Sequence, residues 1–101
     1  MPKKKKIAKT MSEAVEFNDL DVLRTLIRQG HDVNALDPEG ETPLHIAASN
    51  DNKEAIMTLL DAGAQVNKLD SFGVSPLHLA LENDCPEAVI VLEFKGGREI
   101  S

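Results

Sequence analysis

Apolar residues recur three and four positions apart in three segments of the chain, which begin at Asp21, Glu54 and Glu87. This spacing is typical of an amphipathic helix, and an acidic residue in the first turn suits the helix dipole. A glycine, which commonly ends a helix, closes each segment. A shorter apolar segment precedes each of the three. The pattern therefore predicts six helices, over residues 11–17, 20–29, 43–50, 53–62, 76–83 and 86–94.

A longer motif repeats with a step of 33 residues. Asp-x-x-Gly-x-Thr-Pro-Leu-His-x-Ala at residues 37–47 returns as Asp-x-x-Gly-x-Ser-Pro-Leu-His-x-Ala at residues 70–80. Leu26, Leu59 and Leu92 keep the same step, so a degenerate first copy precedes the two clear ones. A unit of this size cannot bury its apolar face alone, and neighbouring units must stack. We therefore expect function on the extended surface of the stack and not in a pocket.

Each clear copy contains a turn followed by the start of a helix. In the segment 37–40, Asp, Pro and Gly occupy positions that a type I turn favours. Thr42 and Ser75 are placed to cap a helix, and the proline after each stands at the first helical position, where a missing N–H costs nothing. These first helices should end near residues 50–51 and 83–84, where Asn and Asp tolerate a left-handed backbone.

The residues that carry the period resemble the ankyrin repeat, over about residues 10–97 and three units. The resemblance implies an all-α solenoid of helix pairs with β-hairpin-like fingers, and an activity that is usually protein binding. We expect a disordered basic tail at residues 1–9 and units at about residues 10–36, 37–69 and 70–101, with residues 98–101 as a C-terminal tail. The first and last units look like polar caps, so we expect a complete protein of three units.

The resemblance also gives the repeat signature a structural role. In the family the histidine of the signature bonds backbone and the Thr or Ser hydroxyl, and thereby ties neighbouring units together. The signature residues are Thr42, Pro43, Leu44 and His45, and in the next copy Ser75, Pro76, Leu77 and His78.

Composition limits the size of the core and the compartment. A chain of 101 residues makes one small domain, and 42% hydrophobic residues with three Phe and neither Trp nor Tyr predict an aliphatic core. No apolar run approaches 18 residues, and the N-terminal sequence lacks the apolar stretch of a secretory signal. One cysteine, Cys85, has no partner for an internal disulfide. We expect an intracellular, cytoplasmic protein.

Charge divides the chain into two parts. Five of the eleven basic residues lie in the first nine, whereas residues 10–101 hold six basic residues against 17 acidic ones, a formal charge of −11. The acidic body disfavours nucleic acid and anionic membranes and favours a protein partner with a basic surface. The run Lys3–Lys6 has three readings: a nuclear-import signal, a solvated leader, or a segment that folds back onto the acidic body.

The chain offers no constellation for catalysis. Cys85 follows Asp84, and an adjacent carboxylate raises the pKa of a thiol, so we expect an inert cysteine. No Cys or His stands at the spacing of metal ligands, and beyond the repeat signature there is no Ser/His/Asp set and no phosphate-binding loop. We expect neither an enzyme, nor a cofactor, nor a metal, nor a small-molecule substrate.

Two asparagines resemble the residues that an asparaginyl hydroxylase modifies in many ankyrin repeats. Asn34 and Asn67 each follow a leucine by eight residues, and Asn34 also follows Asp32 by two. The alternative is structural, since this asparagine normally bonds the backbone of the hairpin. Hydroxylation therefore stays a side hypothesis.

Partners in this family usually lie across the hairpin tips and the inward surface of the first helices. Leu36, Leu69, Phe72 and Val74 are expected to form an apolar patch with acidic residues at its edge. The alternative is that the leucines pack between hairpins and Phe72 covers them. The expected partner-binding residues are Leu36, Pro38, Glu39, Glu41, Ile46, Leu69, Ser71, Phe72, Val74 and Leu79.

These observations favour an intracellular, monomeric protein–protein interaction module. The alternative is an inhibitor or antitoxin-like regulator that blocks a basic surface, such as a nucleic-acid-binding one. A third reading, an enzyme subunit or substrate, would show as activity of its own or as hydroxylation. The identity of the partner does not follow from the sequence, because the repeat fixes the scaffold residues and leaves the contacting ones free.

Overall fold

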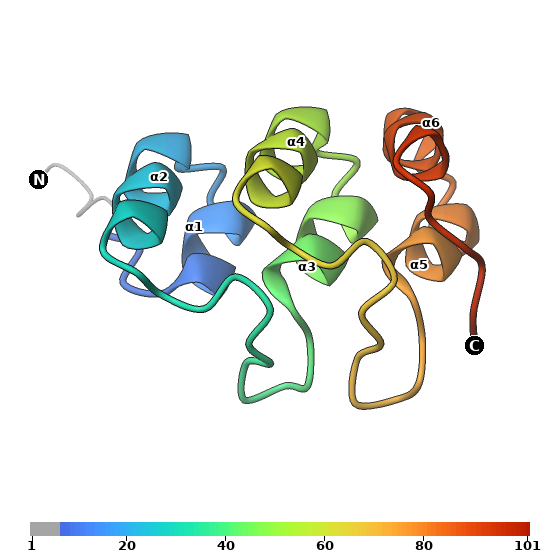
Figure 1. Ribbon diagram of the computed structural model, residues 1–101, viewed down its shortest axis with the longest axis horizontal. Helices are drawn as coiled ribbons and strands as arrows, with labels where there is room; N and C mark the ends of the chain where they lie inside the picture. The colour runs from blue at the N-terminus through green and yellow to red at the C-terminus, as the bar shows by residue number, and fades with distance from the viewer. Residues whose placement is uncertain (1–6) are drawn as a thin grey trace, which may run out of the picture.

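The computed structural model describes residues 7–101, so the run Lys3–Lys6 and its three readings lie outside the described residues. Six helices occur in this part of the chain, and no strand does. They pair as α1 with α2, α3 with α4 and α5 with α6, and the pairs stand side by side along the long axis (Figure 1). The bounds are α1 Met11–Glu16, α2 Leu20–Arg28, α3 Pro43–Ser49, α4 Lys53–Asp61, α5 Pro76–Glu82 and α6 Pro86–Phe94.

The helices confirm the expected all-α architecture. All six begin at the predicted residue, and each ends within one residue of the predicted end. Helices α1, α3 and α5 form one layer and α2, α4 and α6 a second, while two loops extend from the first layer (Figure 1). No helix within residues 7–101 has the length and hydrophobicity needed to cross a bilayer.

Hydrogen bonds from side chains set the ends of the first-layer helices. Thr10, Thr42 and Ser75 accept from the backbone N–H three residues on, at 3.1, 3.3 and 3.2 Å. Pro43 and Pro76 follow two of these caps at the first helical position. The residues just beyond the C-termini, which are Asn18, Asp51 and Asp84, adopt a left-handed backbone with φ of 52 to 54°.

One of these left-handed residues connects two units. The Asp51 carboxylate accepts a hydrogen bond at 2.8 Å from the N–H of Ala88, in the first turn of α6. Cys85 stands at the N-cap of α6 and supplies no side-chain bond, unlike Asp19 and Asn52, which cap α2 and α4 themselves. The second unit therefore caps a helix of the third.

The core is aliphatic, as the composition predicts. Its largest fully buried side chains include Leu23, Leu44, Ile56, Leu59 and Leu92. Ala8 is also buried, and the N–H of Lys9 donates to Glu13 at 3.1 Å. Packing therefore extends two residues beyond the expected boundary at residue 10.

The two loops, here called the first finger (residues 36–41) and the second finger (residues 69–74), are tight turns without strands. Asp37 accepts from the N–H groups of Glu39 and Glu41, both at 2.9 Å, and Asp70 repeats these contacts in the second finger. Gly40 donates to the Asp37 carbonyl at 2.9 Å and accepts from the N–H of Ser71 at 2.9 Å. A Cβ on Gly40, whose φ is 84°, would lie 2.7 Å from that of Ser71, so only glycine lets the fingers approach.

Hydrogen bonds also join the segments that follow the second-layer helices. Asn34 accepts from the N–H of Gln65 at 2.8 Å and donates to the Gly63 carbonyl at 3.4 Å. Asn67 makes the same pair of contacts one unit later, with Arg98 at 2.7 Å and Gly96 at 3.1 Å. Both asparagines thus have the structural contacts that compete with the hydroxylation hypothesis.

The two signature histidines differ. His45 is fully buried, with Nε2 2.7 Å from the Val74 carbonyl of the next unit and Nδ1 2.6 Å from the Thr42 hydroxyl. A carbonyl only accepts, so Nε2 carries the proton and Nδ1 accepts from the hydroxyl. Burial lowers the pKa of His45, although the Val74 bond and the Asp70 charge raise it, so the ring is neutral. This ring ties the second unit to the third.

The expectation of the same bonds for His78 is wrong. Its ring lies 3.1 Å from a carboxylate oxygen of Glu82 and 3.6 Å from one of Glu99. The Ser75 hydroxyl instead donates to the Arg98 carbonyl at 2.6 Å and accepts from the N–H of Ile100 at 3.0 Å. The reason is that the C-terminal segment, and not a further finger, lies beside α5, and its backbone reaches the hydroxyl.

Replacing the two histidines should have unequal effects. His45→Ala leaves a buried carbonyl and a buried hydroxyl unpaired, so we expect a loss of about 2–3 kcal/mol in the free energy of unfolding. His78→Ala removes contacts to exposed carboxylates and should cost less than about 1 kcal/mol. Urea unfolding followed by circular dichroism measures both, and equal losses would contradict the difference in roles.

Candidate protein-binding surface

The expected partner-binding residues lie on the fingers and on α3 and α5. Leu36, Leu69 and Phe72 are 47%, 41% and 73% exposed, and the solvent-facing set is completed by Pro38, Glu39 and Ser71. The others are only half-buried: Glu41, Ile46, Val74 and Leu79.

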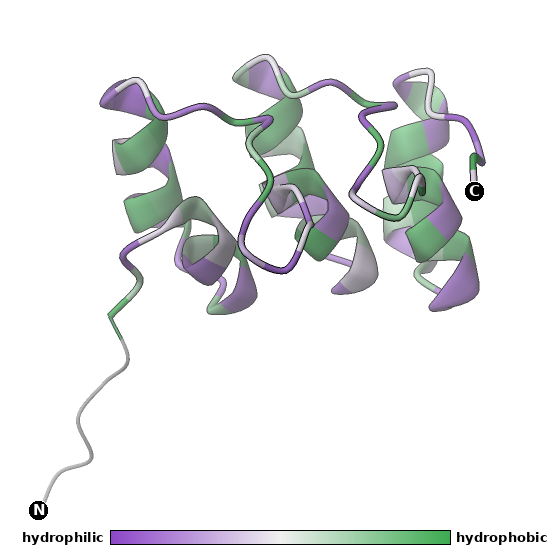
Figure 2. Ribbon diagram, turned by 90° about the horizontal axis from the view of Figure 1, so that it is seen from below, coloured by the Kyte–Doolittle hydropathy of each residue, from purple (hydrophilic) through white to green (hydrophobic). Residues whose placement is uncertain are grey.

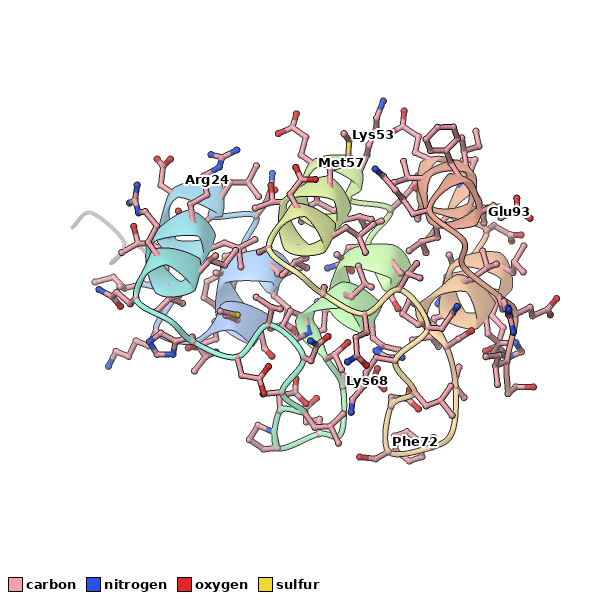
Figure 3. All side chains as sticks on the ribbon, in the orientation of Figure 1. Arg24, Lys53, Met57, Lys68, Phe72 and Glu93 are labelled. Carbon is pink, nitrogen blue, oxygen red and sulfur yellow. The ribbon has the colours of Figure 1, made fainter. Side chains whose placement is uncertain are left out.

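Phe72 is the most exposed of these apolar residues and stands at the tip of the second finger (Figure 3). The hydrogen bonds of Asp70 and the contact between Ser71 and Gly40 hold the backbone on either side of it. An aromatic side chain on a fixed turn loses little further conformational freedom when a partner covers it. Phe72 is therefore suited to anchor a partner.

Leu36 has different surroundings. It lines a groove of about 550 Å³ between the first finger and the first unit, together with Met11, Pro38 and Pro43. Glu13, Glu16, Asp32, Asp37 and Glu39 line the same groove, and Lys9 is the one lysine or arginine among its lining residues. The structure thus separates the expected apolar patch into a groove beside Leu36 and a tip at Phe72.

A second hollow, of about 210 Å³, continues the acidic surface toward α3. Glu16, Asp37 and Glu39 line both hollows, and the second adds Glu41, Ile46 and Ser49. We call the surface formed by Glu13, Glu16, Asp37 and Glu39 the acidic groove. Glu13 and Glu16 were not among the expected partner-binding residues, because the first unit lacks the signature that aligns its positions with the others.

Glu41 differs from its expected place at an acidic edge. Its carboxylate faces Asp70 and His45, with one donor atom of each of the three residues within 4.8 Å of the others. One of its oxygens, Oε2, is buried without a hydrogen-bond partner. Glu41 therefore lies between the two fingers and does not point freely toward a partner.

The surroundings of Glu41 also change its protonation. Burial, a hydrogen bond to Asp70 and the charges of Asp70 and Asp37 raise its pKa to about 7. Burial alone would raise the pKa of Asp70 as well, but hydrogen bonds from the N–H groups of Val74 and Phe72 outweigh it and lower that pKa. Asp70 is thus the ionised member of the pair, and Glu41 holds the shared proton below about pH 7.

Glu41, His45 and Asp70 together offer atom types that bind metal ions. Both ring nitrogens of His45, however, already make hydrogen bonds, to Val74 and Thr42. A metal would have to break one of these two bonds. The cluster therefore serves as a link between the second and third units.

Cys85 has the environment of an inert thiol. It is 5% exposed, and its Sγ lies 3.4 Å from the Ser49 carbonyl. Burial raises its pKa, and the charges of Asp51 and Asp84 raise it further, against a lowering hydrogen bond from Asp51. A thiol held in this form is a poor nucleophile.

Comparison with known proteins gives one family and two relatives. The family model described as "Ankyrin repeats (3 copies)" matches residues 11–100. The "Ankyrin repeat and LEM domain-containing protein 1 homolog" of Caenorhabditis elegans is 39% identical over 49 residues, or 48% of this chain and 7% of that protein. The "Putative ankyrin repeat protein FPV232" of Fowlpox virus (strain NVSL) is 44% identical over 43 residues, or 43% of this chain and 9% of that protein. The matched part is thus less than a tenth of each relative.

The shared proton of Glu41 should make stability depend on pH. From the ordinary pKa of 4.5 up to about 7, the folded protein holds a proton that the unfolded chain has released, so stability falls as the pH rises. Glu41→Gln keeps the uncharged form at every pH. We expect its Tm to match that of the native chain at pH 5 and to exceed it by about 3 °C or more at pH 8.

Glu39→Gln is the matched control, because Glu39 is exposed on the same finger. Its Tm difference from the native chain should not change between pH 5 and pH 8. Differential scanning calorimetry at the two pH values measures all three proteins. A larger effect of Glu41→Gln at pH 5 than at pH 8 would show that Glu41 is ionised in the folded protein.

Proposed function

Because the chain belongs to the ankyrin repeat family, whose repeats are generally protein–protein interaction modules, we propose that it binds a protein partner at the acidic groove and the finger tips. The observation that carries the proposal is the convergence of carboxylates from two units on a hollow that Leu36 lines. The proposal assigns no catalysis and no cofactor to the chain. An intracellular location, common among ankyrin repeat proteins, is part of it.

The partner should present basic side chains beside an apolar one. Lysine or arginine side chains would reach the carboxylates of Glu16, Asp37 and Glu39, which line both hollows. An apolar side chain would pack on Leu36 in the same groove, and a second contact would cover Phe72. Charge of this kind directs encounter and selects the partner, whereas buried apolar contacts slow dissociation.

A second candidate function follows from the same charge. With a formal charge of −11 over residues 10–101, the body could act as an inhibitor that covers a basic surface, including one that binds nucleic acid. Such a regulator would abolish an activity of its partner at a ratio of one to one. A plain interaction module would leave that activity intact.

We expect Phe72→Ala to weaken binding by about 2 kcal/mol or more, mainly through faster dissociation, because an exposed aromatic anchor loses its whole contact area. The partner is first captured from lysate of the source organism, identified by mass spectrometry and purified, and its binding is then measured by surface plasmon resonance. Met57→Ala is the matched control, since Met57 is 41% exposed and lies on α4, away from the fingers (Figure 3). Equal affinities of the two variants would exclude Phe72 as an anchor.

Charge reversal in the acidic groove should act on association. For the double variant Glu16→Lys, Glu39→Lys we expect association to be slower by about tenfold and less dependent on salt, with dissociation little changed. Helicity should stay native, because both side chains are exposed. Unchanged association at low and high salt would sink the acidic groove as the binding site. The second-layer face with Arg24, Arg28, Lys53 and Asp61 would then be tested.

A further inference from the structure

An apolar surface lies at the C-terminal end of the stack, far along the chain from the acidic groove. Leu81 is 40% exposed and Ile90 67% exposed, and both line an open groove of about 560 Å³ between α5 and α6. Ala80, Cys85 and Val89 add further apolar lining, and Asp84 is the one charged residue among the lining residues. We call this surface, formed by Leu81, Asp84, Val89 and Ile90, the end face.

Helix α6 has almost no polar side. Its sequence, PEAVIVLEF, places apolar residues around most of its circumference, and the hydropathy colouring in Figure 2 shows hydrophobic residues along this helix pair. A helix that is apolar all round is normally covered on more than one side. In this protein α6 packs against α4 and α5, which leaves its outer side with Ile90 and Phe94 exposed.

The earlier units show what covers the equivalent positions. Ala48 and Ile56, which precede Leu81 and Val89 by 33 residues, are fully buried. They are buried because the third unit packs on the second, through contacts of α3 with α5 and of α4 with α6. The end face thus has the shape and the apolar positions of a surface that receives helices.

Asp84 adds a polar feature to this face. It shares the left-handed backbone of Asp51, with φ of 52° in both residues. The Asp51 carboxylate caps α6 through the N–H of Ala88, at 2.8 Å, because Cys85 does not. Within residues 7–101 no hydrogen bond to the Asp84 side chain is observed, so its carboxylate is available in the position from which Asp51 caps a helix.

We propose that the end face binds a helix of a second protein, with the N-terminus of that helix on the Asp84 carboxylate and its apolar side on Leu81, Val89 and Ile90. The charges are complementary, because the N-terminus of a helix carries partial positive charge and free N–H groups. The occupant resembles α6: an apolar helix without an acidic side chain at its own N-cap. This site is separate from the acidic groove and holds whether or not that groove binds a partner.

A second copy of this chain does not fit as the occupant. Stacked in the register of the array, it would place Asp19 at the position that Asn52 and Cys85 hold inside the array. Asp19 already caps its own helix through the N–H of Val22, at 3.2 Å. Its carboxylate would therefore face that of Asp84 as an unpaired like charge, which disfavours association.

The test uses two helical peptides, each held helical by a hydrocarbon staple on its outer side. Both carry the sequence of residues 85–95, one with Cys85→Ala and the other with Cys85→Asp, so that only the second caps itself. Each is titrated into the ¹⁵N-labelled full chain, and amide shifts are followed by NMR. We expect the Cys85→Ala peptide to shift the signals of residues 81–90 and to bind about fivefold or more tightly than the Cys85→Asp peptide. Shifts confined to the fingers, or no shifts, would overturn the proposal.

Two variants of the full chain separate the parts of the end face. Asp84→Gly keeps the left-handed backbone and removes the carboxylate, and should weaken the Cys85→Ala peptide by about fivefold. Leu81→Lys should abolish binding, whereas Met57→Lys, at a site of equal exposure on α4, should not change it. Equal affinity of the native chain and Asp84→Gly, or a chain that sediments as a dimer through this face, would contradict the proposed occupant.

Discussion

Ala48 and Ile56 are fully buried only because a neighbouring helix pair covers them, whereas the equivalent Leu81 and Val89 remain open to solvent. This dependence of each unit on the next is the constraint behind the rest of the structure. It accounts for the hydrogen bonds at the junctions, where His45 bonds Val74 and Asp51 caps α6. Polar groups at a junction that is closed to water need partners, and the neighbouring unit supplies them.

The candidate binding surface arises from the same junctions. Close approach of the fingers requires Gly40 opposite Ser71, and this approach brings Glu41 against Asp70. One carboxylate is thereby withdrawn from the surface, while Asp37 and Glu39 stay at the outer side of the first finger and line the groove. Stacking thus decides which acidic residues a partner can meet, and the number of acids in the sequence does not.

The sequence predicted the helices well because their signals are local. Thr42-Pro43 and Ser75-Pro76 mark helix starts, and the glycines mark helix ends, without reference to neighbours. It failed where the outcome depends on contacts between units. His78 has the same signature as His45, yet its ring contacts differ because the C-terminal segment takes the place of a finger. Glu41 looks like a surface residue until the second finger lies beside it. Glu13 and Glu16 stayed unrecognised because their unit lacks the motif.

The short sequence span of the junction contacts also determines how the chain can reach this structure. The side-chain hydrogen bonds between units join residues 23 to 37 positions apart, as in Ser75 with Arg98 and Asp51 with Ala88. Closing loops of this length costs little entropy, and a chain with such local contacts folds quickly. The second unit has a neighbour on both sides and the outer units have one each, so it gains the most interface energy. Folding should therefore nucleate around α3 and α4 and spread outward, and the chain should fray from its two ends.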